Sequence, residues 1–282
     1  MTPDQYCQQK TKASHSSFAF AFFFLGKKKR LALTALYAFC REVDDIVDDC
    51  KEKTVGKTRL DEWRLEIERL FNQAPQHPVA IALSPHITSC KFDKKHFIEI
   101  IDGMEMDLNC NRYNDLKKFK LYCYRAASAV GLLSANIFGY TNKSTLKYAH
   151  DLGIALQITN IIRDIAEDSE RGRIYIPLEL LKKYNISEDD VLHNKNNEQI
   201  ALLIDELSNL AKNYYQSAIN QLPDEDKDTQ KPGLIMGNIY FILLQKIMKG
   251  NTGNTLDNRV SLSTYKKLVI AITTSLGKTW IS

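Results

Sequence analysis

The stretch YAFCREVDDIVDD, residues 37–49, places four aspartates and one arginine inside a segment that otherwise has the composition of a buried helix. At the helical period of 3.6 residues, one stripe of this helix carries four polar side chains: Tyr37, Arg41, Asp44 and Asp48. Asp45 and Asp49 lie about 100° around the helix from that stripe. The segment therefore aims two carboxylates, those of Asp44 and Asp48, in one direction and one turn apart.

Two interpretations of this acidic stripe are open from these residues alone. Most charge runs are solvated faces of a helix. Here, however, residues 31–39 are apolar nearly all round, as in a helix inside a protein, and buried acids need partners. Carboxylates on neighbouring turns are about 5–6 Å apart at Cβ and repel each other, so a cation between them would stabilise the pair. Magnesium, bound through carboxylates and a substrate diphosphate, is the cation that best fits an all-oxygen set.

The composition of the chain predicts an all-α protein. The 282 residues are 44% hydrophobic and 26% charged, which is ordinary for a globular protein that buries a sizeable core. This length fits one large domain or two small ones. The chain has 12 glycines and 7 prolines, and no proline lies between His86 and Tyr175, so its middle can form long helices.

Hydrophobic periodicity predicts helices over further segments: 59–71, 79–91, 94–108, 116–138, 145–167, 177–184, 198–222, 233–248 and a closing helix from Leu262. Residues 186–197 are predicted to be a polar connection. In segment 94–108 we expect Asp102, Glu105 and Asp107 on the outer face and the methionines in the core. The small residues of segment 116–138 permit close helix packing or leave room for a long apolar ligand, and both can hold on different faces.

The charge and the cysteines limit the class of protein. The net charge of +4 is spread along the chain, with small clusters such as residues 27–30. It suits an anionic ligand or loose membrane contact, and it lacks the concentrated basic face of a nucleic-acid-binding protein, a function that we therefore exclude. The six cysteines include no CxxC pair and are expected to be buried thiols in a reducing cytoplasm. The aromatic run at 18–25 is too short to span a bilayer, so any membrane contact is expected to be peripheral.

A second stretch, GIALQITNIIRDIAED at residues 153–168, repeats the geometry of the first. Four polar side chains share one face at spacings of three, four and four: Gln157, Asn160, Asp164 and Asp168. Arg163 lies beside that face, and isoleucines form the opposite stripe. Two such helices inside an apolar bundle match what a cluster of Mg²⁺ ions bridging to a diphosphate requires, because each ion prefers about six oxygen ligands. The pair of helices favours a metal site over a solvated face.

Three motifs resemble those of the squalene and phytoene synthase family of head-to-head isoprenyl diphosphate synthases: YAFCREVDDIVDD, GIALQITNIIRDIAED followed by RGRIYIP, and YCYRAASAVGLL. The similarity covers essentially the whole chain. Within the family, EIIDGMEMDL (99–108) and GLLSANIFGYT (131–141) are most similar to the bacterial presqualene diphosphate synthases of hopanoid pathways. The resemblance implies a single domain over residues 1–282, an all-α bundle of the isoprenoid-synthase type around a central apolar cavity.

The resemblance also implies roles for individual residues. Mg²⁺ would be held by Asp44, Asp48, Asn160 and Asp164, with Asp168 as an outer acid of the second motif. Diphosphate contacts would come from Ser14, Ser17, Tyr37, Arg41, Gln157, Arg163, Tyr240 and Arg259. The two serines belong to a cluster whose composition is equally usual at a turn or helix cap. Tyr122 matches a tyrosine near the reacting carbons and forms the implied catalytic set with Asp44, Asp48, Asp164 and Arg41.

The apolar pocket for the prenyl chain is expected to be a tunnel that excludes water from a carbocation. Its expected lining is Phe18, Phe20, Phe22, Leu133 and Ile137. Some of these phenylalanines can equally be core residues. Ala126 and Ser128 depart from the family, in which many relatives have valine and glycine, and this departure concerns the shape of the pocket and not the catalytic residues.

The implied activity is the Mg²⁺-dependent, head-to-head condensation of two farnesyl diphosphates to presqualene diphosphate, with two or three ions bridging to diphosphate and without NADPH. Phytoene synthase, which joins two geranylgeranyl diphosphates, and squalene or dehydrosqualene synthase remain alternatives. A non-enzymatic assembly factor on the same fold is a further one, although every acid of both motifs is retained. The implied partners are prenyl diphosphates and enzymes of the same pathway. The implied location is the cytoplasm, with peripheral contact at the inner face of the membrane.

Overall fold

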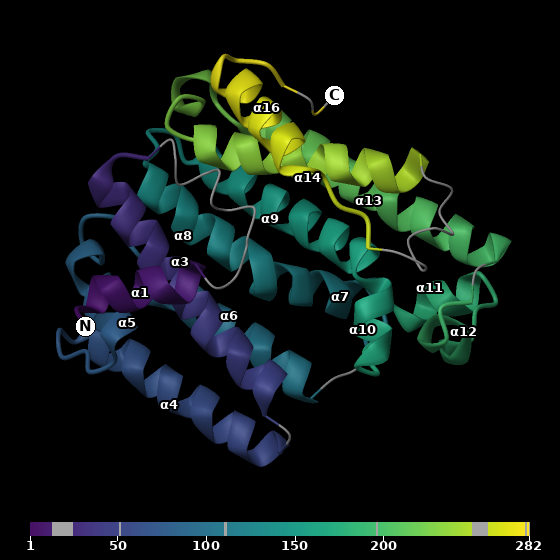
Figure 1. The fold of residues 1–282 in the computed structure, drawn as a ribbon, viewed down its shortest axis with the longest axis horizontal. Helices are drawn as coiled ribbons and strands as arrows, with labels where there is room; N and C mark the ends of the chain where they lie inside the picture. The colour runs from purple at the N-terminus through teal and green to yellow at the C-terminus, as the bar shows by residue number, and fades with distance from the viewer. Residues whose placement is uncertain are drawn as a thin grey trace.

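The computed structural model describes residues 1–12, 25–50, 52–109, 112–195, 197–249, 259–279 and 281. Over these residues the fold is an all-α bundle, and its only β-type pairing is an isolated bridge between Arg112 and Ile174 (Figure 1). The α-helices are α1 (Pro3–Lys12), α3 (Lys27–Asp49), α4 (Lys53–Phe71), α5 (Pro78–Leu83), α6 (Lys94–Asn109), α7 (Leu116–Cys123), α8 (Ala129–Phe138), α9 (Ser144–Arg163), α10 (Ile165–Glu170), α11 (Leu178–Lys183), α12 (Glu188–Leu192), α13 (Glu198–Gln221), α14 (Lys231–Lys249) and α16 (Thr264–Ser275). No helix of the described part is both long enough and apolar enough to cross a membrane.

The first acidic motif lies on α3, a helix of 23 residues that begins after Gly26. Its inner face is apolar, and Leu36, Phe39 and Val43 are fully buried. This face packs against α1, α5 and α6, with α1 lying across it (Figure 1). The burial of one face holds α3 in place and leaves the polar stripe of the motif on another face.

Two hydrophobic clusters meet at α8. The first is built mainly from α9, α13 and α14, and the second from α1, α3, α4, α5 and α6. Helix α8 contributes Leu132 and Ala135 to the first cluster and Leu133 and Ile137 to the second. The protein is thus a single-domain helical bundle. That this domain covers all of residues 1–282 stays a prediction.

Several predicted segments differ from the observed elements, and the helix predicted over 59–71 begins six residues earlier, at Lys53. In segment 79–91 the α-helix ends at Leu83, because Pro85 lacks an N–H group and cannot continue the helix; a 3₁₀ turn, Ser84–His86, follows. Segment 145–167 is broken at Asp164, between α9 and α10. The polar connection 186–197 contains the short helix α12, whose start is a capping box between Ser187 and Asp190.

The small residues of segment 116–138 serve both of their expected purposes. Between α7 and α8 the chain forms a π-helical turn, Tyr124–Ser128. At this turn α9 comes so close that a Cβ atom on Gly153 would lie 2.5 Å from the Cα of Ser128. Ala126, Ala127 and Ser134 line a cavity instead. Close packing and space for a ligand therefore occur on different faces of one helical run.

Replacing Gly153 with serine is expected to destabilise the fold by about 1–3 kcal/mol, because the new side chain would overlap backbone atoms of Ser128. The loss should appear as a lower melting temperature, by roughly 2–4 °C for each kcal/mol. Gly26→Ser is the matched control, since a Cβ atom there meets nothing within 4 Å and serine is favoured at a helix N-cap. Equal melting temperatures for the two variants would show that the contact between α9 and the π-helical turn is loose.

Candidate active site

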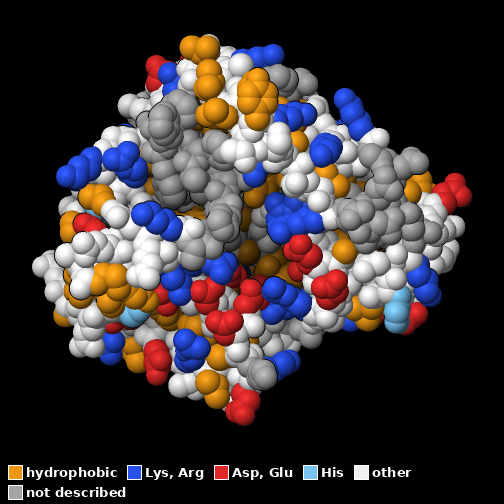
Figure 2. All heavy atoms as spheres, viewed as in Figure 1, with side chains coloured by type: hydrophobic (Ala, Val, Ile, Leu, Met, Phe, Trp, Pro, Cys, Tyr) orange, Lys and Arg blue, Asp and Glu red, His pale blue; other side chains and the backbone are white. Residues whose placement is uncertain are grey.

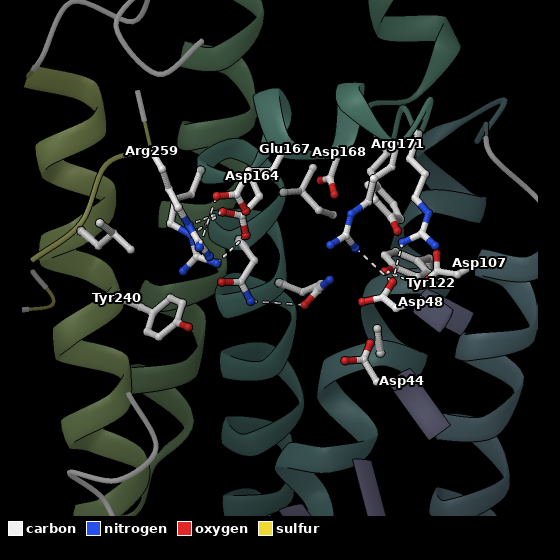
Figure 3. Close-up of a pocket in the computed structure, with 18 of the residues that line it drawn as sticks. Asp44, Asp48, Asp107, Tyr122, Asp164, Glu167, Asp168, Arg171, Tyr240 and Arg259 are labelled. Atoms are coloured by element: carbon white, nitrogen blue, oxygen red, sulfur yellow. Dashed lines mark hydrogen bonds and ion pairs between the residues drawn. The ribbon is translucent and has the colours of Figure 1, made fainter. Parts of the chain in front are cut away.

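A cavity of about 700 Å³ opens between α3, α6, α7, α9, α10 and α14 (Figure 3). Every site residue expected from the sequence that lies within the described ranges lines it: Tyr37, Arg41, Asp44, Asp48, Tyr122, Gln157, Asn160, Arg163, Asp164, Asp168, Tyr240 and Arg259. Ser14 and Ser17 lie outside the described residues. In the space-filling view, acidic and basic side chains gather around the hollow (Figure 2). The fold thus brings the two acidic motifs to one place, although their roles stay predictions.

The acids of the first motif are paired with arginines. The guanidinium of Arg41 donates to Asp44 Oδ2 at 2.5 Å and also to Asp45. Asp48 Oδ1 accepts from Arg171 at 3.0 Å and from Arg173 at 3.2 Å. Asp45 does not line the cavity. The periodicity of the motif therefore separated the cavity-facing Asp44 and Asp48 from Asp45.

The acids of the second motif lie at and after a break in the helix at Asp164. This residue ends α9 and precedes α10, with φ −103° and ψ 12°. Asp164 accepts from Arg163, and its Oδ1 also lies 3.0 Å from Arg259 Nε. Arg259 reaches Glu167 as well, at 3.3 Å. Asp164, Glu167 and Asp168 lie across the cavity from Asp44 and Asp48, with Arg171 between them (Figure 3).

Burial and like charges disfavour ionisation of two of these acids. Burial raises the pKa of Asp44, and the neighbouring Asp48 raises it further. Burial and the adjacent Asp164 raise the pKa of Asp168 to about 7. The amide oxygen of Asn160 is buried and has no hydrogen-bond partner among the described residues. An oxygen without a partner and two carboxyls that are costly to ionise both favour a bound cation.

Among the described residues, no three acidic, histidine or cysteine side chains lie close enough together to hold a metal ion. The donor set itself fits Mg²⁺, which prefers oxygen ligands and completes its octahedral shell with water and substrate phosphate. Asp44, Asp48, Asn160, Asp164 and Asp168 offer carboxylate and amide oxygens to one cavity. Magnesium therefore remains a prediction that the chemistry of the side chains supports.

Asp107 was predicted on an outer face, and this prediction was wrong. Its side chain lines the cavity, and its Oδ2 accepts a hydrogen bond of 3.1 Å from the hydroxyl of Tyr122. Burial raises the pKa of Asp107 to about 7, although Arg173 acts in the opposite direction. The sequence contains a signal for this position: Asp107 follows Ile100 and Met104, both buried, at helical spacing. The outer acids Asp102 and Glu105 pair with Arg64 instead.

Three tyrosine rings form a stack beside Asp107. The ring centroids of Tyr122 and Tyr175 are 5.0 Å apart, and those of Tyr122 and Tyr113 are 5.1 Å apart. Burial, and after it the charge of Asp107, hold the pKa of Tyr122 well above its usual value. Tyr122 therefore stays protonated and donates to Asp107, and the stack presents aromatic faces where a cation could be stabilised.

The motif RGRIYIP supplies three cavity residues to which we assigned no role from sequence: Arg171, Arg173 and Tyr175. The two arginines contact Asp48, from a motif more than 120 residues earlier in the chain. Their position directly after the second acidic helix was the available signal. These arginines add positive charge to a cavity that Arg41, Arg163 and Arg259 also line.

An apolar branch of about 220 Å³ adjoins the polar cavity. Five residues line both spaces: Tyr37, Ala126, Gln157, Asn160 and Tyr240. The expected tunnel residues Leu133 and Ile137 do not line this branch, because they face the second hydrophobic cluster. Val130, Ser134 and Phe138, on the adjacent face of the same helix, take their place. Phe18, Phe20 and Phe22 lie outside the described residues.

Comparisons with known proteins show the family of this chain. Residues 11–266 match the squalene/phytoene synthase family. The 15-cis-phytoene synthase of Synechocystis is 32% identical over 277 residues, which cover 94% of this chain and 82% of the relative. Phytoene synthase 2 of Solanum lycopersicum is also 32% identical. The match covers 86% of this chain and 79% of that relative.

Solved structures share the fold as well. A dehydrosqualene synthase superposes with a TM-score of 0.87 at 26% identity, over 97% of this chain and 95% of that one. A squalene synthase from Alicyclobacillus acidocaldarius has a TM-score of 0.81 at 22% identity, over 89% and 94% of the two chains. With its paired acidic motifs in one cavity beside an apolar branch, this chain belongs to the squalene/phytoene synthase family, whose members are prenyltransferases.

Proposed function

We propose that this protein joins two farnesyl diphosphates head to head, forms presqualene diphosphate and releases one diphosphate. The observation that carries the proposal is the junction of a charged chamber with an apolar one, where Tyr37, Gln157 and Tyr240 line both. A diphosphate requires the first environment and a prenyl chain the second. The reacting carbon, which joins the two parts of the substrate, would lie at this junction.

Arginines on several elements would bind the two diphosphates. Arg41, Arg163 and Arg171 are each paired with an aspartate in the cavity, and bidentate guanidinium groups recognise phosphate well. Mg²⁺ held by Asp44, Asp48, Asn160, Asp164 and Asp168 would neutralise the charge that develops on the departing diphosphate. Breaking of the C1–O bond, with the electron pair leaving on the diphosphate, produces an allylic cation. The apolar branch excludes water from that cation.

The second substrate supplies the electrons for the new bond. Its C2–C3 double bond attacks C1 of the cation, and C3 becomes the positive centre. Loss of a proton from the donor's C1 then allows the C1–C3 bond to form and closes the cyclopropane. Tyr122 can accept this proton while its own hydroxyl proton passes to Asp107, since the two groups are 3.1 Å apart. The stack of tyrosines lies beside the same position.

Chain length separates this proposal from a second candidate, phytoene synthase, which the names of the curated relatives favour. The branch follows the helical run from Ala126, in the π-helical turn, to Phe138, at the end of α8, a rise of about 18 Å. Three backbone bonds of an extended chain span about 3.6 Å, so a four-bond isoprene unit spans about 4.8 Å. The three units of a farnesyl chain therefore span about 14 Å, and the four units of a geranylgeranyl chain span about 19 Å. The farnesyl chain fits with space to spare, and the longer chain would have to reach Phe138.

Purified protein with Mg²⁺ and farnesyl diphosphate is expected to yield presqualene diphosphate without NADPH. The assay supplies farnesyl and geranylgeranyl diphosphates in parallel reactions, measures released diphosphate and identifies the products by mass spectrometry. Phytoene as the sole product would replace the first candidate by the second. No diphosphate release with either substrate would contradict both and would favour a non-enzymatic role.

A further inference from the structure

The last helix, α16, exposes an apolar stripe to solvent. Tyr265, Leu268 and Ile272 on the helix and Leu276 directly after it are 77%, 47%, 47% and 81% exposed. At 100° per residue these four side chains fall within a sector of about 80°. Figure 2 shows hydrophobic side chains gathered over α16, at the top of the view. They form one continuous stripe, which differs from the isolated exposed leucines that are normal on a protein surface.

The stripe does not contribute to the packing of α16 in the bundle. The opposite face of the helix does that: Ile270, Ala271 and Thr274 are buried, and α16 packs on α14. Thr274 also accepts a hydrogen bond from Asn238 of α14 at 2.9 Å. A helix on the surface of a globular protein is normally polar on its outer face. Helix α16 is apolar on both faces, and one of them is uncovered.

Lysines line a hollow beside the end of α16 at which the stripe finishes. Ser275, next to Leu276, lines a hollow of about 690 Å³ together with Lys27, Lys28, Lys29 and Lys231, and with one acid, Asp228. Asp228 pairs with Lys231 at 2.9 Å. Lys266 adds an exposed positive charge on α16 itself. Positive charge therefore predominates beside the apolar stripe.

We propose that this surface, the stripe of α16 together with the lysines at its end, docks on an anionic lipid bilayer. An amphipathic stripe with an aromatic residue and flanking lysines is the pattern that inserts at the interface between headgroups and acyl chains. Tyr265 can keep its hydroxyl among the headgroups while its ring enters the apolar layer. Lys27 and Lys28 would lie opposite the negative surface of the leaflet.

The charges favour a bilayer over a second copy of this chain. A symmetric dimer with the two α16 helices parallel would bring the lysines of both copies towards each other, and like charges in an interface disfavour association. An anionic leaflet pairs with all of them at once. The hollow also shares Pro232 with the apolar branch of the active site. Docking would therefore place the membrane near the far end of the chamber that we assign to the prenyl chain.

The test is co-sedimentation of the purified full chain with phosphatidylcholine vesicles, with and without phosphatidylglycerol. We expect the wild type to pellet with the anionic vesicles and much less with the neutral ones. Leu268→Ser combined with Ile272→Ser should lower the partition coefficient at least about tenfold, because two half-exposed apolar side chains are removed. Lys27→Gln with Lys28→Gln should weaken binding chiefly at low ionic strength.

The matched control is Leu121→Ser combined with Leu202→Ser, two leucines on α7 and α13 that are 42% and 49% exposed. This variant should bind vesicles like the wild type. Melting temperatures of the α16 variant and of this control report on folding without any use of activity, so the result does not depend on the proposed reaction. Wild-type protein that stays in the supernatant, or equal binding by the two double variants, would overturn the proposal. A dimer in light scattering that the α16 variant dissociates, without vesicle binding, would assign the stripe to a second copy instead.

Discussion

Replacement of Asp44 with asparagine is expected to lower kcat/KM with prenyl diphosphate by about 10³-fold or more, or about 4 kcal/mol of transition-state stabilisation. Asp44 lines the cavity, and burial together with Asp48 already raises its pKa. The neutral amide keeps the shape of the side chain and can still accept from Arg41, so the fold should survive. What is lost is half of a carboxylate pair that would hold Mg²⁺ against the diphosphate. The measurement is diphosphate release over a range of Mg²⁺ concentrations.

Asp45→Asn is the matched control for this experiment. The two aspartates are neighbours on α3 and both pair with Arg41, but Asp45 bonds Lys10 at 2.8 Å and lies outside the cavity. The control variant should retain most of the wild-type rate and the wild-type dependence on Mg²⁺. Asp164→Asn, on the opposite wall, should behave like Asp44→Asn. Wild-type rates in Asp44→Asn or Asp164→Asn would refute the metal assignment.

Replacement of Asp107 with asparagine is expected to lower kcat by about 10²–10⁴-fold, the range in which a positioned acid or base contributes. The amide can still accept the hydrogen bond from Tyr122, so the ring should stay in place, but it cannot take up a proton. In the wild type the pKa of Asp107 is about 7, so kcat/KM should fall as the pH decreases below 7. That acidic limb should be shallower in the residual activity of Asp107→Asn, where Asp168, whose pKa is also about 7, still titrates. An unchanged pH profile in the variant would mean that Asp107 only positions Tyr122.

Asp107 should also make the stability of the ligand-free protein depend on pH. Its pKa rises from the ordinary value of 3.8 to about 7 on folding, so the folded state binds the proton more tightly than the unfolded state. The contribution to stability is therefore fully present below pH 3.8 and is lost as the pH rises to about 7. A shift of roughly three pKa units corresponds to up to about 4 kcal/mol. Asp107→Asn should thus gain stability relative to the wild type between pH 5 and pH 8.

Denaturant unfolding at several pH values measures this difference. Asp228→Asn is the control, because the Asp228 side chain is 88% exposed and its substitution should change the unfolding free energy little at any pH. Parallel curves for Asp107→Asn and the wild type would show that the carboxyl is not desolvated in the folded state.

The sequence by itself determined the fold class and most of the cavity. Helical spacing placed Asp44 and Asp48 on one stripe and Asn160 and Asp164 on another, and both stripes line one cavity. This worked because the position of a side chain around a helix depends only on local geometry, which the sequence specifies residue by residue. The resemblance to the family extended the set to Tyr240 and Arg259, which no local pattern connects to the acids. Ser14 and Ser17 fall outside the described residues, so their placement stays a prediction.

Only the tertiary structure decided what faces what. The spacing of Asp107 to Ile100 and Met104 allowed an inward position, but the pattern could not show that the neighbour would be the hydroxyl of Tyr122. Likewise, Leu133 and Val130 lie on adjacent faces of the same run of helix, and the packing of α9 and α14 selects the face that borders the apolar branch. Arg171 and Arg173 meet Asp48 through a contact between segments far apart in the chain. Such contacts follow from how the helices pack together, which local periodicity does not contain.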